Sequence, residues 1–426
     1  MIEPRILKGF RDSLPQQEIT RQNLISEVQK IFRSFGFVPI DTPAIEYSEV
    51  LLGKGGGETD KQMFRFRDNG DRDVSLRFDL TVPLARYVAA NKDKLTFPFK
   101  RYHIGKVWRG EKPQKGRFRE FYQCDFDIIG TDSIASDFEI LLMIHTCLSE
   151  MNIGEFRILV SHRGIINTFL ESISLSDKSD EILRIIDKLS KIGRDGVAEN
   201  LKECGIDEDG IKKILNFLSL TKNGFSETLG ILSEQLGKTD DIARLEELFI
   251  MLKDCGIESS FLLDTSVTRG LDYYTGIVYE TQLVQLPQIG SICSGGRYDN
   301  LAGLYTKDRL SGVGSCIGLD RLIAALEETA GSIVNSTGSA DILIASGKID
   351  TATAQNIAVK FRKSGIKTDC YAGTKDMGHQ FSYAEKNGIR FVICNKTDKD
   401  SYSVKEIATR QMYEDISFDE IVKKVK

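Results

Sequence analysis

A long antiparallel hairpin is the sequence feature that most constrains the fold of this chain. Residues 97–130 contain two runs rich in aromatic and β-branched residues, FPFKRYHIGKVWR and FREFYQCDFDIIG, joined by the basic segment EKPQKGR. Two such runs around a polar turn predict adjacent antiparallel strands. Because 426 residues exceed what one hydrophobic core usually supports, we expect this hairpin to belong to one of two or three domains.

The pattern along the rest of the chain separates strand-rich parts from a helical part. Lys, Asp, Glu, Leu and Ile recur at helical spacing over about 170–257, and strand-like runs return from residue 261. After the soft linker AGSIVNSTGSA, strands alternate with helices, which predicts βαβ units in a small three-layer domain. We therefore expect a domain over 1–330 with a mainly helical insertion at about 170–257, followed by a C-terminal domain over 338–426.

Composition excludes several classes of protein. No apolar run approaches the roughly 20 residues that span a bilayer, and the first residues lack the apolar core of a signal peptide. The 8 cysteines form no CxxC pair and the 4 histidines form no HExxH motif. We expect a cytoplasmic protein with reduced thiols, no membrane segment and no structural or catalytic metal site.

The charge of the chain is uneven. Its net charge is −5, which gives no overall sign of nucleic-acid binding, yet residues 100–119 carry eight basic side chains and one acid, Glu111. A polyanion could bind at such a segment without the whole chain being basic. A solvated basic hairpin explains the same charges.

The two strands of the hairpin each present polar residues on one face. Alternation of side chains places Arg109 and Glu111 together on the outgoing strand. On the returning strand, four residues share a face: Phe121, Gln123, Asp125 and Asp127. Together they offer a guanidinium for phosphate, a ring for a base and carboxylates for a cation. Surface ion pairs would explain any single pair, but burying this many polar groups without a ligand is costly.

Two further segments combine glycine with charged or aromatic residues. In GVGSCIGLDRLIAAL, glycines at 312, 314 and 318 leave space over a strand, and Arg321 projects from the start of a helix. Tight strand–helix packing could explain the glycines but not the arginine. In RGLDYYTGIVYE, residues 269–280, the alternation in GIVYET predicts a strand. The tyrosines before it could belong to strand packing or to a polar site.

Taken in order, these segments resemble a known family. GFVPIDTPAI, the hairpin and GVGSCIGLDRLIAAL resemble the three signature motifs of class II aminoacyl-tRNA synthetases. RGLDYYTGIVYE and SGGRYDNL (294–301) resemble the histidine-specific signature pair of the histidyl-tRNA synthetases, and the resemblance runs along the whole chain. It departs at Asp320, where the third motif usually has glutamate, and at Cys316, where it usually has glycine.

The resemblance implies a fold and an activity. The fold would be an α+β catalytic domain built on an antiparallel sheet flanked by helices, with a helical insertion and a C-terminal α/β three-layer domain that binds the anticodon. The activity would be the activation of L-histidine with ATP to histidyl-adenylate, and transfer of the histidyl group to the 3′ end of tRNA(His). Mg²⁺ bridging the outer phosphates of ATP and a homodimer are also implied.

The resemblance also implies roles for individual residues. Arg109 and Arg269 would flank the α-phosphate as the catalytic residues and border the bound histidine. ATP would further contact Glu111, Phe121 and Arg321. The histidine site would comprise Asp79, Thr81 and Gln123 at the ammonium group, Asp127 and Tyr273 at the imidazole, and Tyr274 in the pocket wall. Gln114 and Arg117 would contact tRNA. The GKGGGE stretch at 53–58 lacks the ending of a P-loop and is expected to be a mobile loop near the site.

Two other classes of protein remain as alternatives. A catalytically silent relative, such as a regulatory subunit of histidine biosynthesis or a sensor module, would share the fold but tend to lose the catalytic arginines or the C-terminal domain. A pure RNA-binding protein would need no pocket for an ammonium group and an imidazole. The presence of Arg109, Arg269 and Arg321 favours the synthetase.

Overall fold

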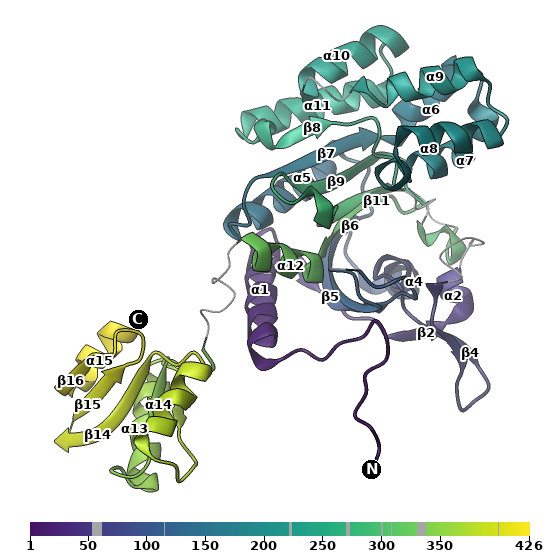
Figure 1. The fold of residues 1–426 in the computed structure, drawn as a ribbon. Helices are drawn as coiled ribbons and strands as arrows, with labels where there is room; N and C mark the ends of the chain where they lie inside the picture. The colour runs from purple at the N-terminus through teal and green to yellow at the C-terminus, as the bar shows by residue number, and fades with distance from the viewer. Residues whose placement is uncertain are drawn as a thin grey trace. The chain divides into compact units, whose positions relative to one another are not determined.

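An eight-stranded, largely antiparallel sheet forms the centre of the larger part of the protein (Figure 1). The computed structural model describes residues 1–52, 62–114, 116–220, 224–269, 273–299, 301–307, 309–329, 338–398 and 400–426. Its described residues form two units. The N-terminal unit comprises Met1–Asp12 and Leu24–Thr329, and the C-terminal unit comprises Ser13–Asn23 and the described residues within Ala330–Lys426.

The strands of the central sheet come from distant parts of the chain. In spatial order they are β1 (Val38–Pro39), β5 (Phe99–Trp108), β6 (Glu120–Ile129), β11 (Gly312–Gly318), β10 (Cys293–Tyr298), β9 (Ile277–Leu283), β7 (Phe156–His162) and β8 (Phe261–Leu263). The pairs β1–β5 and β7–β8 are parallel, and the other neighbours are antiparallel. The expected α+β fold on an antiparallel sheet is confirmed.

The predicted hairpin is the best-paired part of the sheet. Strands β5 and β6 are in continuous register from Phe99 opposite Ile129 to Trp108 opposite Glu120. At the end of the ladder, the indole Nε1 of Trp108 donates to Glu120 Oε2 at 2.8 Å. The expectation that Arg109 and Glu111 lie on the outgoing strand is wrong, because β5 ends at Trp108. The chain leaves the ladder at Gly110, whose amide donates to the Gln62 carbonyl at 2.7 Å.

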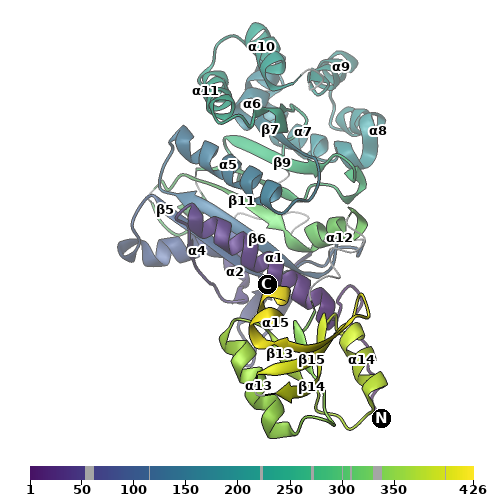
Figure 2. The same ribbon diagram turned by 90° about the vertical axis from the view of Figure 1, so that its left-hand side faces the viewer.

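One face of the sheet is apolar and covered by two helices, α1 (Pro15–Ser34) and α5 (Ile134–Glu150) (Figure 2). Every second residue of β6 faces them, and the ring of Phe126 lies 4.8 Å from that of Phe32 in α1. Both rings are fully buried, and burying such a side chain stabilises the fold by about 1.5–3 kcal/mol. The alternate residues of β6 therefore face the other side of the sheet, where the polar groups gather.

A smaller sheet and several helices surround this polar side. The strands of the smaller sheet are, in order, β2 (Ile45–Tyr47), β4 (Asp73–Leu76) and β3 (Arg65–Arg67). The nearby helices and turns are α2 (Ser48–Leu52), α4 (Thr81–Asn91), η1 (Lys92–Lys94), η5 (Pro287–Ile289), η6 (Leu301–Leu304) and α12 (Leu319–Thr329). The helix predicted in the second half of GVGSCIGLDRLIAAL, where Arg321 lies, is α12.

Between β7 and β8, the regular elements in the described residues are all helical. They are α6 (Arg163–Ser172), η2 (Ser176–Lys178), α7 (Ser179–Ile186), α8 (Leu189–Glu203), α9 (Glu208–Phe217), α10 (Phe225–Leu236), α11 (Asp240–Asp254) and η4 (Glu258–Ser260). A buried carboxylate connects them to the sheet: Asp137 of α5 pairs with Arg244 of α11 at 2.7 Å and with Arg297 of β10 at 2.6 Å. Such a pair is costly to break, because removing one partner leaves a buried charge.

The C-terminal unit is a separate three-layer structure. Its sheet has the order β13 (Thr368–Cys370), β12 (Ile342–Ile344), β14 (Phe391–Asp398), β15 (Ser401–Glu406) and β16 (Met412–Ser417). Alternate residues of β12 point into two cores, one shared with α13 (Thr351–Lys363) and α15 (Phe418–Val425), the other with α14 (Met377–Lys386). The predicted βαβ units are confirmed, whereas β15, β16 and α15 were not predicted.

Candidate active site

The polar face of the central sheet is a buried floor of charged and amide groups. Gln123, Asp125 and Asp127 on β6 are each less than 10% exposed. In the sheet register they lie opposite Gly105, His103 and Arg101 of β5, and opposite Gly318, Cys316 and Gly314 of β11. Antiparallel pairing therefore brings polar and small residues of three strands into one area. The alternation in β6 had predicted only that its own polar residues share a face.

Asp127 is held by two neighbours. Its Oδ2 lies 2.5 Å from Arg101 Nη2, and its Oδ1 accepts a hydrogen bond from the hydroxyl of Tyr298 at 2.6 Å. Burial raises the pKa of Asp127, and Arg101 acts in the opposite direction. A Cβ atom at Gly314 would lie 1.9 Å from Asp127 Oδ1. Glycine at position 314 therefore makes room for the carboxylate rather than for a ligand directly.

Asp79 and Gln123 present acceptors that the described part of the chain does not satisfy. The amide of Val82 donates to Asp79 Oδ1 at 3.0 Å, but Asp79 Oδ2 and Gln123 Oε1 are buried without a hydrogen-bond partner. Burial raises the pKa of Asp79 to about 6. Since an unsatisfied buried acceptor costs free energy, both atoms are suited to a donor supplied by a ligand.

Thr81 and Asp125 lie beside these acceptors. The Thr81 hydroxyl lies 3.5 Å from Asp125 Oδ2. Burial raises the pKa of Asp125 to about 7; Arg101 lowers it, and both Asp127 and Asp79 raise it. The carboxylates at 79, 125 and 127 thus lie within electrostatic reach of one another, in a place suited to a cationic group.

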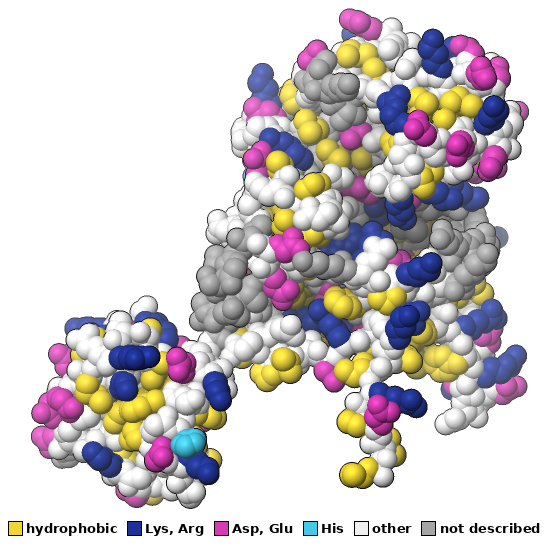
Figure 3. All heavy atoms as spheres, viewed as in Figure 1, with side chains coloured by type: hydrophobic (Ala, Val, Ile, Leu, Met, Phe, Trp, Pro, Cys, Tyr) yellow, Lys and Arg dark blue, Asp and Glu magenta, His cyan; other side chains and the backbone are white. Residues whose placement is uncertain are grey.

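Arginines gather next to these carboxylates. The Arg109 Nε donates to the Phe78 carbonyl at 2.9 Å, and its guanidinium lies 5.3 Å from the centre of the Phe121 ring. Glu111 offers only loose pairing, at 3.9 Å from Arg109 and 3.8 Å from Arg117. On the face shown in Figure 3, Lys and Arg side chains gather across the middle of this unit.

Arg321, in the first turn of α12, completes this group of cations. Its Nη1 donates to the Ser291 carbonyl at 2.5 Å. Burial and, to a smaller extent, the neighbouring Arg117 and Arg109 lower the pKa of Arg321 to about 10. Several guanidinium groups therefore lie close together, and few carboxylates neutralise their charge. Such a group of cations is suited to binding an anion.

Arg269 and the two tyrosines after it lie over the same floor. Burial raises the pKa of Tyr273, Asp79 raises it further and Arg269 lowers it, so these groups interact. The rings of Tyr273 and Tyr274 are 4.6 Å apart, and Gly296 leaves space for the second ring, since a Cβ there would lie 2.8 Å from it. The tyrosines therefore line the polar site. Residues 270–272 lie outside the described residues.

Arg269 itself is paired and has an unusual backbone. Its Nη1 lies 2.5 Å from Glu280 Oε1 on β9. Burial lowers the pKa of Arg269, but Glu280 outweighs this effect and the pKa lies above its usual range. The residue has φ = 54°, a left-handed conformation that non-glycine residues seldom adopt.

The remaining predicted positions lie at the rim or outside the described residues. Gln114 and Arg117 exchange backbone hydrogen bonds of 3.1 and 2.9 Å across the turn after β5, and Gln114 is exposed. The basic segment therefore forms a tight turn beside the arginines. The loop predicted over residues 53–58, and Lys115, lie outside the described residues.

Asp320 and Cys316, the two departures from the family pattern, both have a place in the structure. Asp320 forms an ion pair with Arg11, and its Oδ2 accepts from the Tyr122 amide at 2.8 Å. Cys316 lies on β11 opposite Asp125, and burial raises the pKa of its thiol. Asp320 thus anchors the start of α12 to β6.

Sequence reasoning missed three residues of this site: Arg101, Tyr298 and Glu280. Tyr298 lies within the SGGRYDNL motif, so that motif contained a signal for it. Glu280 is the last residue of the RGLDYYTGIVYE motif that Arg269 begins, so that motif also contained a signal. Arg101 contacts Asp127 only because of the register of β5 against β6, and this pairing has no signature in local sequence.

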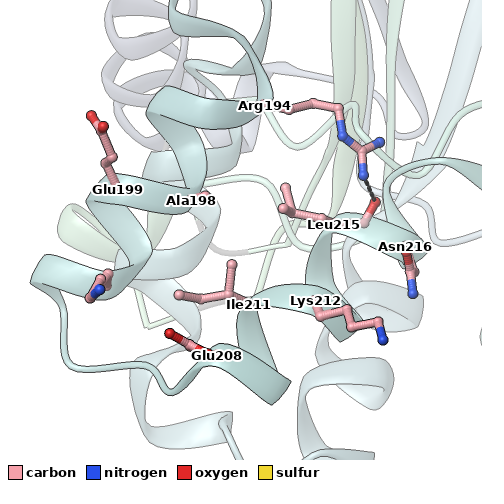
Figure 4. Close-up of a pocket in the computed structure, with 9 residues that line it drawn as sticks. Arg194, Ala198, Glu199, Glu208, Ile211, Lys212, Leu215 and Asn216 are labelled. Carbon is pink, nitrogen blue, oxygen red and sulfur yellow. Dashed lines mark hydrogen bonds between the residues drawn. The ribbon is translucent and has the colours of Figure 1, made fainter.

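A hollow of ≈ 380 Å³ in the helical insertion contains none of the predicted site residues (Figure 4). It lies between α8 and α9 and is lined by Arg194, Ala198, Glu199, Lys202, Glu208, Ile211, Lys212, Leu215 and Asn216. Arg194 crosses it to donate to the Leu215 carbonyl at 3.2 Å. The chemistry described above therefore belongs to the sheet and not to this hollow.

No group of three or more His, Cys, Asp or Glu side chains among the described residues could hold a metal ion. No helix within the described ranges is long and apolar enough to cross a membrane.

Comparison with known proteins identifies the class. The family model "Histidyl-tRNA synthetase" matches residues 9–322, and the family model "Anticodon binding domain" matches residues 340–426. The histidine–tRNA ligase of Treponema denticola is 53% identical over 408 residues, which are 94% of this chain and 90% of the relative. All these matches are to aminoacyl-tRNA synthetases or their domains.

Solved structures agree with the sequence matches. The crystal structure of histidyl-tRNA synthetase from Nostoc sp. PCC 7120 has a TM-score of 0.87 and 31% identity, covering 100% of this chain and 99% of that one. A Bacillus halodurans protein described as an ATP phosphoribosyltransferase regulatory subunit/histidyl-tRNA synthetase has a TM-score of 0.76 at 23% identity, covering 93% and 100%. The second similarity concerns the fold alone. The chain belongs to the histidyl-tRNA synthetase family.

Proposed function

We propose that the protein is a histidine–tRNA ligase. It activates L-histidine with ATP to histidyl-adenylate and then transfers the histidyl group to the 3′ end of tRNA(His). The observation that carries this proposal is the placement of unsatisfied buried acceptors at Asp79 and Gln123 beside the cluster of arginines. A zwitterionic amino acid and a polyphosphate need these two neighbouring environments.

The arginines act on the phosphates of ATP. The histidine carboxylate attacks the α-phosphorus and pyrophosphate leaves, so the protein supplies positioning and charge rather than a nucleophile. Arg109 and Arg269 flank the α-phosphate and stabilise the charge that grows there. Arg321 binds the γ-phosphate and covers the adenine, which stacks on Phe121, with Glu111 at the adenine edge.

The polar floor binds histidine. Asp79, Thr81 and Gln123 hold the ammonium group, which donates to the acceptors left unsatisfied at 79 and 123. Asp127 and Tyr273 contact the imidazole, and Tyr274 lines the pocket. The carboxylate of Asp127 accepts from Tyr298 and retains lone pairs for an imidazole N–H. A pocket that pairs both ring nitrogens rejects apolar side chains strongly.

Mg²⁺ would accompany ATP rather than occupy a site made by the protein. No group of three or more acidic, His or Cys side chains in the described residues could hold a metal. Mg²⁺ commonly keeps several waters and binds through substrate phosphates. Mg²⁺ would supply positive charge to the phosphates of ATP, and Arg321 would add protein charge beside them.

The remaining partners follow from the family and from the two units. The turn with Gln114 and Arg117 contacts the acceptor end of tRNA, and the C-terminal domain over 338–426 reads the anticodon loop, where unpaired bases can be splayed and stacked. The domain over 1–330, with its insertion at about 170–257, carries catalysis. The enzyme acts as a homodimer in the cytoplasm.

A catalytically silent relative is the main alternative. Such a protein could keep the sheet and the histidine pocket, but it would have no need for a group of guanidiniums without matching carboxylates. Arg109, Arg117 and Arg321 are close enough for the first two to lower the pKa of the third. This arrangement favours an enzyme that binds ATP.

Pyrophosphate exchange with each of the twenty amino acids tests the proposal. The purified protein is expected to exchange pyrophosphate into ATP only when histidine is present, and without tRNA. Exchange driven by another amino acid in preference to histidine would overturn the substrate. Binding of histidine without any exchange would favour the silent relative.

A further inference from the structure

The strained conformation of Arg269 needs neighbours to hold it. A left-handed backbone is unfavourable for a non-glycine residue, and such conformations persist only where the surroundings fix them. The Arg269 side chain is tied to Glu280. Its backbone is contacted by another residue, Arg163, which is the first residue of α6.

Arg163 contacts both ends of the segment that runs from Arg269 to Gly276. Its Nη1 lies 3.2 Å from the Thr268 carbonyl and 3.3 Å from the Arg269 carbonyl, to which it donates. Its own amide donates to the Gly276 carbonyl at 3.0 Å. The side chain of Arg163 is 8% exposed, so a charged donor has been buried where it fixes the two carbonyls around Arg269.

A second contact anchors the same point to the helical insertion. The hydroxyl of Thr268, which is 1% exposed, donates to the Leu183 carbonyl in α7 at 3.2 Å. Three residues earlier, the hydroxyl of Thr265 donates to the Phe217 carbonyl in α9 at 2.6 Å. The segment that leads to Arg269 is therefore attached to the helices at Thr265 and at Thr268. Of these two residues, only Thr268 adjoins the arginine.

We propose that Arg163 is a positioning residue for adenylate formation: it fixes the backbone of Arg269 so that the guanidinium reaches the α-phosphate. Thr268 supports the same conformation from α7. This inference rests on the proposed function, because it assigns to Arg163 a role that acts through Arg269. A small displacement of a charged group at a reacting centre can cost much of its effect.

Single-turnover histidyl-adenylate formation tests the inference in a double-mutant cycle. Arg163→Gln should lower the rate about 10- to 100-fold, the range expected for losing charged hydrogen bonds, while the KM values for histidine and ATP change little. Adding Arg163→Gln to Arg269→His should cost no more than about 2-fold further, since coupled residues are not additive. A full multiplicative loss in the double variant, or a wild-type rate in Arg163→Gln, would overturn the inference.

Thr268→Val and Thr265→Val form a matched pair in case Arg163→Gln does not fold. Each variant removes one buried threonine hydroxyl bonded to a helix carbonyl, so their losses of thermal stability should be similar. Thr268→Val should slow adenylate formation about 5-fold or more, and Thr265→Val should leave the rate unchanged. Equal rates in the two variants would contradict the positioning role.

The cycle separates this inference from the function on which it rests. Wild-type protein without histidine-dependent exchange would overturn the proposed function itself. Wild-type activity with an unaffected Arg269→His variant would remove the role of Arg269. Activity that depends on Arg269 but not on Arg163 or Thr268 would overturn the positioning role alone.

Discussion

The surroundings of Asp125 disfavour the ionised form of its carboxyl group. It is 2% exposed, and burial raises its pKa to about 7 from an ordinary value of 3.8. The unfolded chain releases this proton near pH 4 while the folded chain retains it to about pH 7. The carboxyl therefore makes folding less favourable as pH rises through this window, and its full cost is reached above pH 7.

Asp125→Asn should consequently stabilise the ligand-free protein at high pH. We expect the gain in the free energy of unfolding to be about 1–3 kcal/mol larger at pH 8 than at pH 5, as measured by urea unfolding. Asp195→Asn, which changes an exposed carboxylate in α8, should show no such difference. A gain that is equal at the two pH values would show that Asp125 is ionised throughout.

Arg269→His tests the arginine at the reacting phosphate. Losing one preorganised donor to a developing charge typically costs roughly 10²–10³ in rate, so adenylate formation should fall by that factor while histidine binding changes far less. If Arg269 only braces the strand through Glu280, the variant loses thermal stability and its folded fraction keeps the wild-type rate. Thermal unfolding, histidine binding and single-turnover adenylation on one preparation separate these outcomes.

Strand β11 shows how one element can be fitted to a site by its glycines. A Cβ at Gly314 would lie 1.9 Å from Asp127 Oδ1, whereas the nearest atom to a Cβ at Gly318, on the same face, is 3.6 Å away. Between them, Cys316 occupies a position where the family usually has glycine. The strand therefore tolerates side chains at two of these positions and excludes one at the third.

Gly314→Ala should displace Asp127 from Arg101 and Tyr298. We expect the KM for histidine to rise at least about 10-fold and the protein to lose about 1–3 kcal/mol of stability, as in overpacked cores. Gly318→Ala serves as the matched control and should leave both quantities nearly unchanged. If the two variants have the same KM for histidine, Gly314 does not shape the histidine site.

The elements of the fold differ in how far sequence could predict them. The hairpin was predictable because two ten-residue strands alternate apolar and polar residues and flank a turn rich in Lys, Gly and Pro. The helices of the insertion were predictable from their apolar spacing. Strands β15 and β16 were not predicted, since β15 buries three consecutive residues and β16 is largely exposed, so neither strand alternates clearly between apolar and polar residues.

The site was predictable as a set of residues but not as a geometry. Motifs pointed to Asp127 and Arg269, which the structure brings to one face of the sheet. The pairing of Asp127 with Arg101 depends on strand register, and the pairing of Arg269 with Glu280 joins two residues that are 11 positions apart in the sequence. The left-handed backbone of Arg269 also has no signal, since an arginine, unlike a glycine, gives no reason to expect positive φ.

At the scale of the whole molecule, two units divide the proposed work. The C-terminal unit has its own sheet and two cores, and the candidate site residues all belong to the N-terminal unit. Ser13–Asn23, however, groups with the C-terminal unit.

Deleting residues 338–426 should spare adenylate formation and weaken tRNA charging. We expect histidine-dependent pyrophosphate exchange within a few-fold of wild type, and charging of tRNA at limiting concentration lowered about 100-fold or more, because a second linked contact is lost. Circular dichroism and thermal unfolding check that the remaining chain is folded. Normal charging by a folded truncated protein would rule out the anticodon role.

The hydrogen bond from Trp108 to Glu120 has an optical consequence. Trp108 is the only tryptophan of the chain, and it directly precedes Arg109, which we place at the α-phosphate. The Trp108 side chain lies with Glu120 on the face of the sheet opposite Phe121, so its intrinsic fluorescence comes, without any label, from one position behind the proposed nucleotide site. A change in emission on adding ATP would follow occupancy of that site in real time, and the C-terminal unit contributes no tryptophan background to the signal.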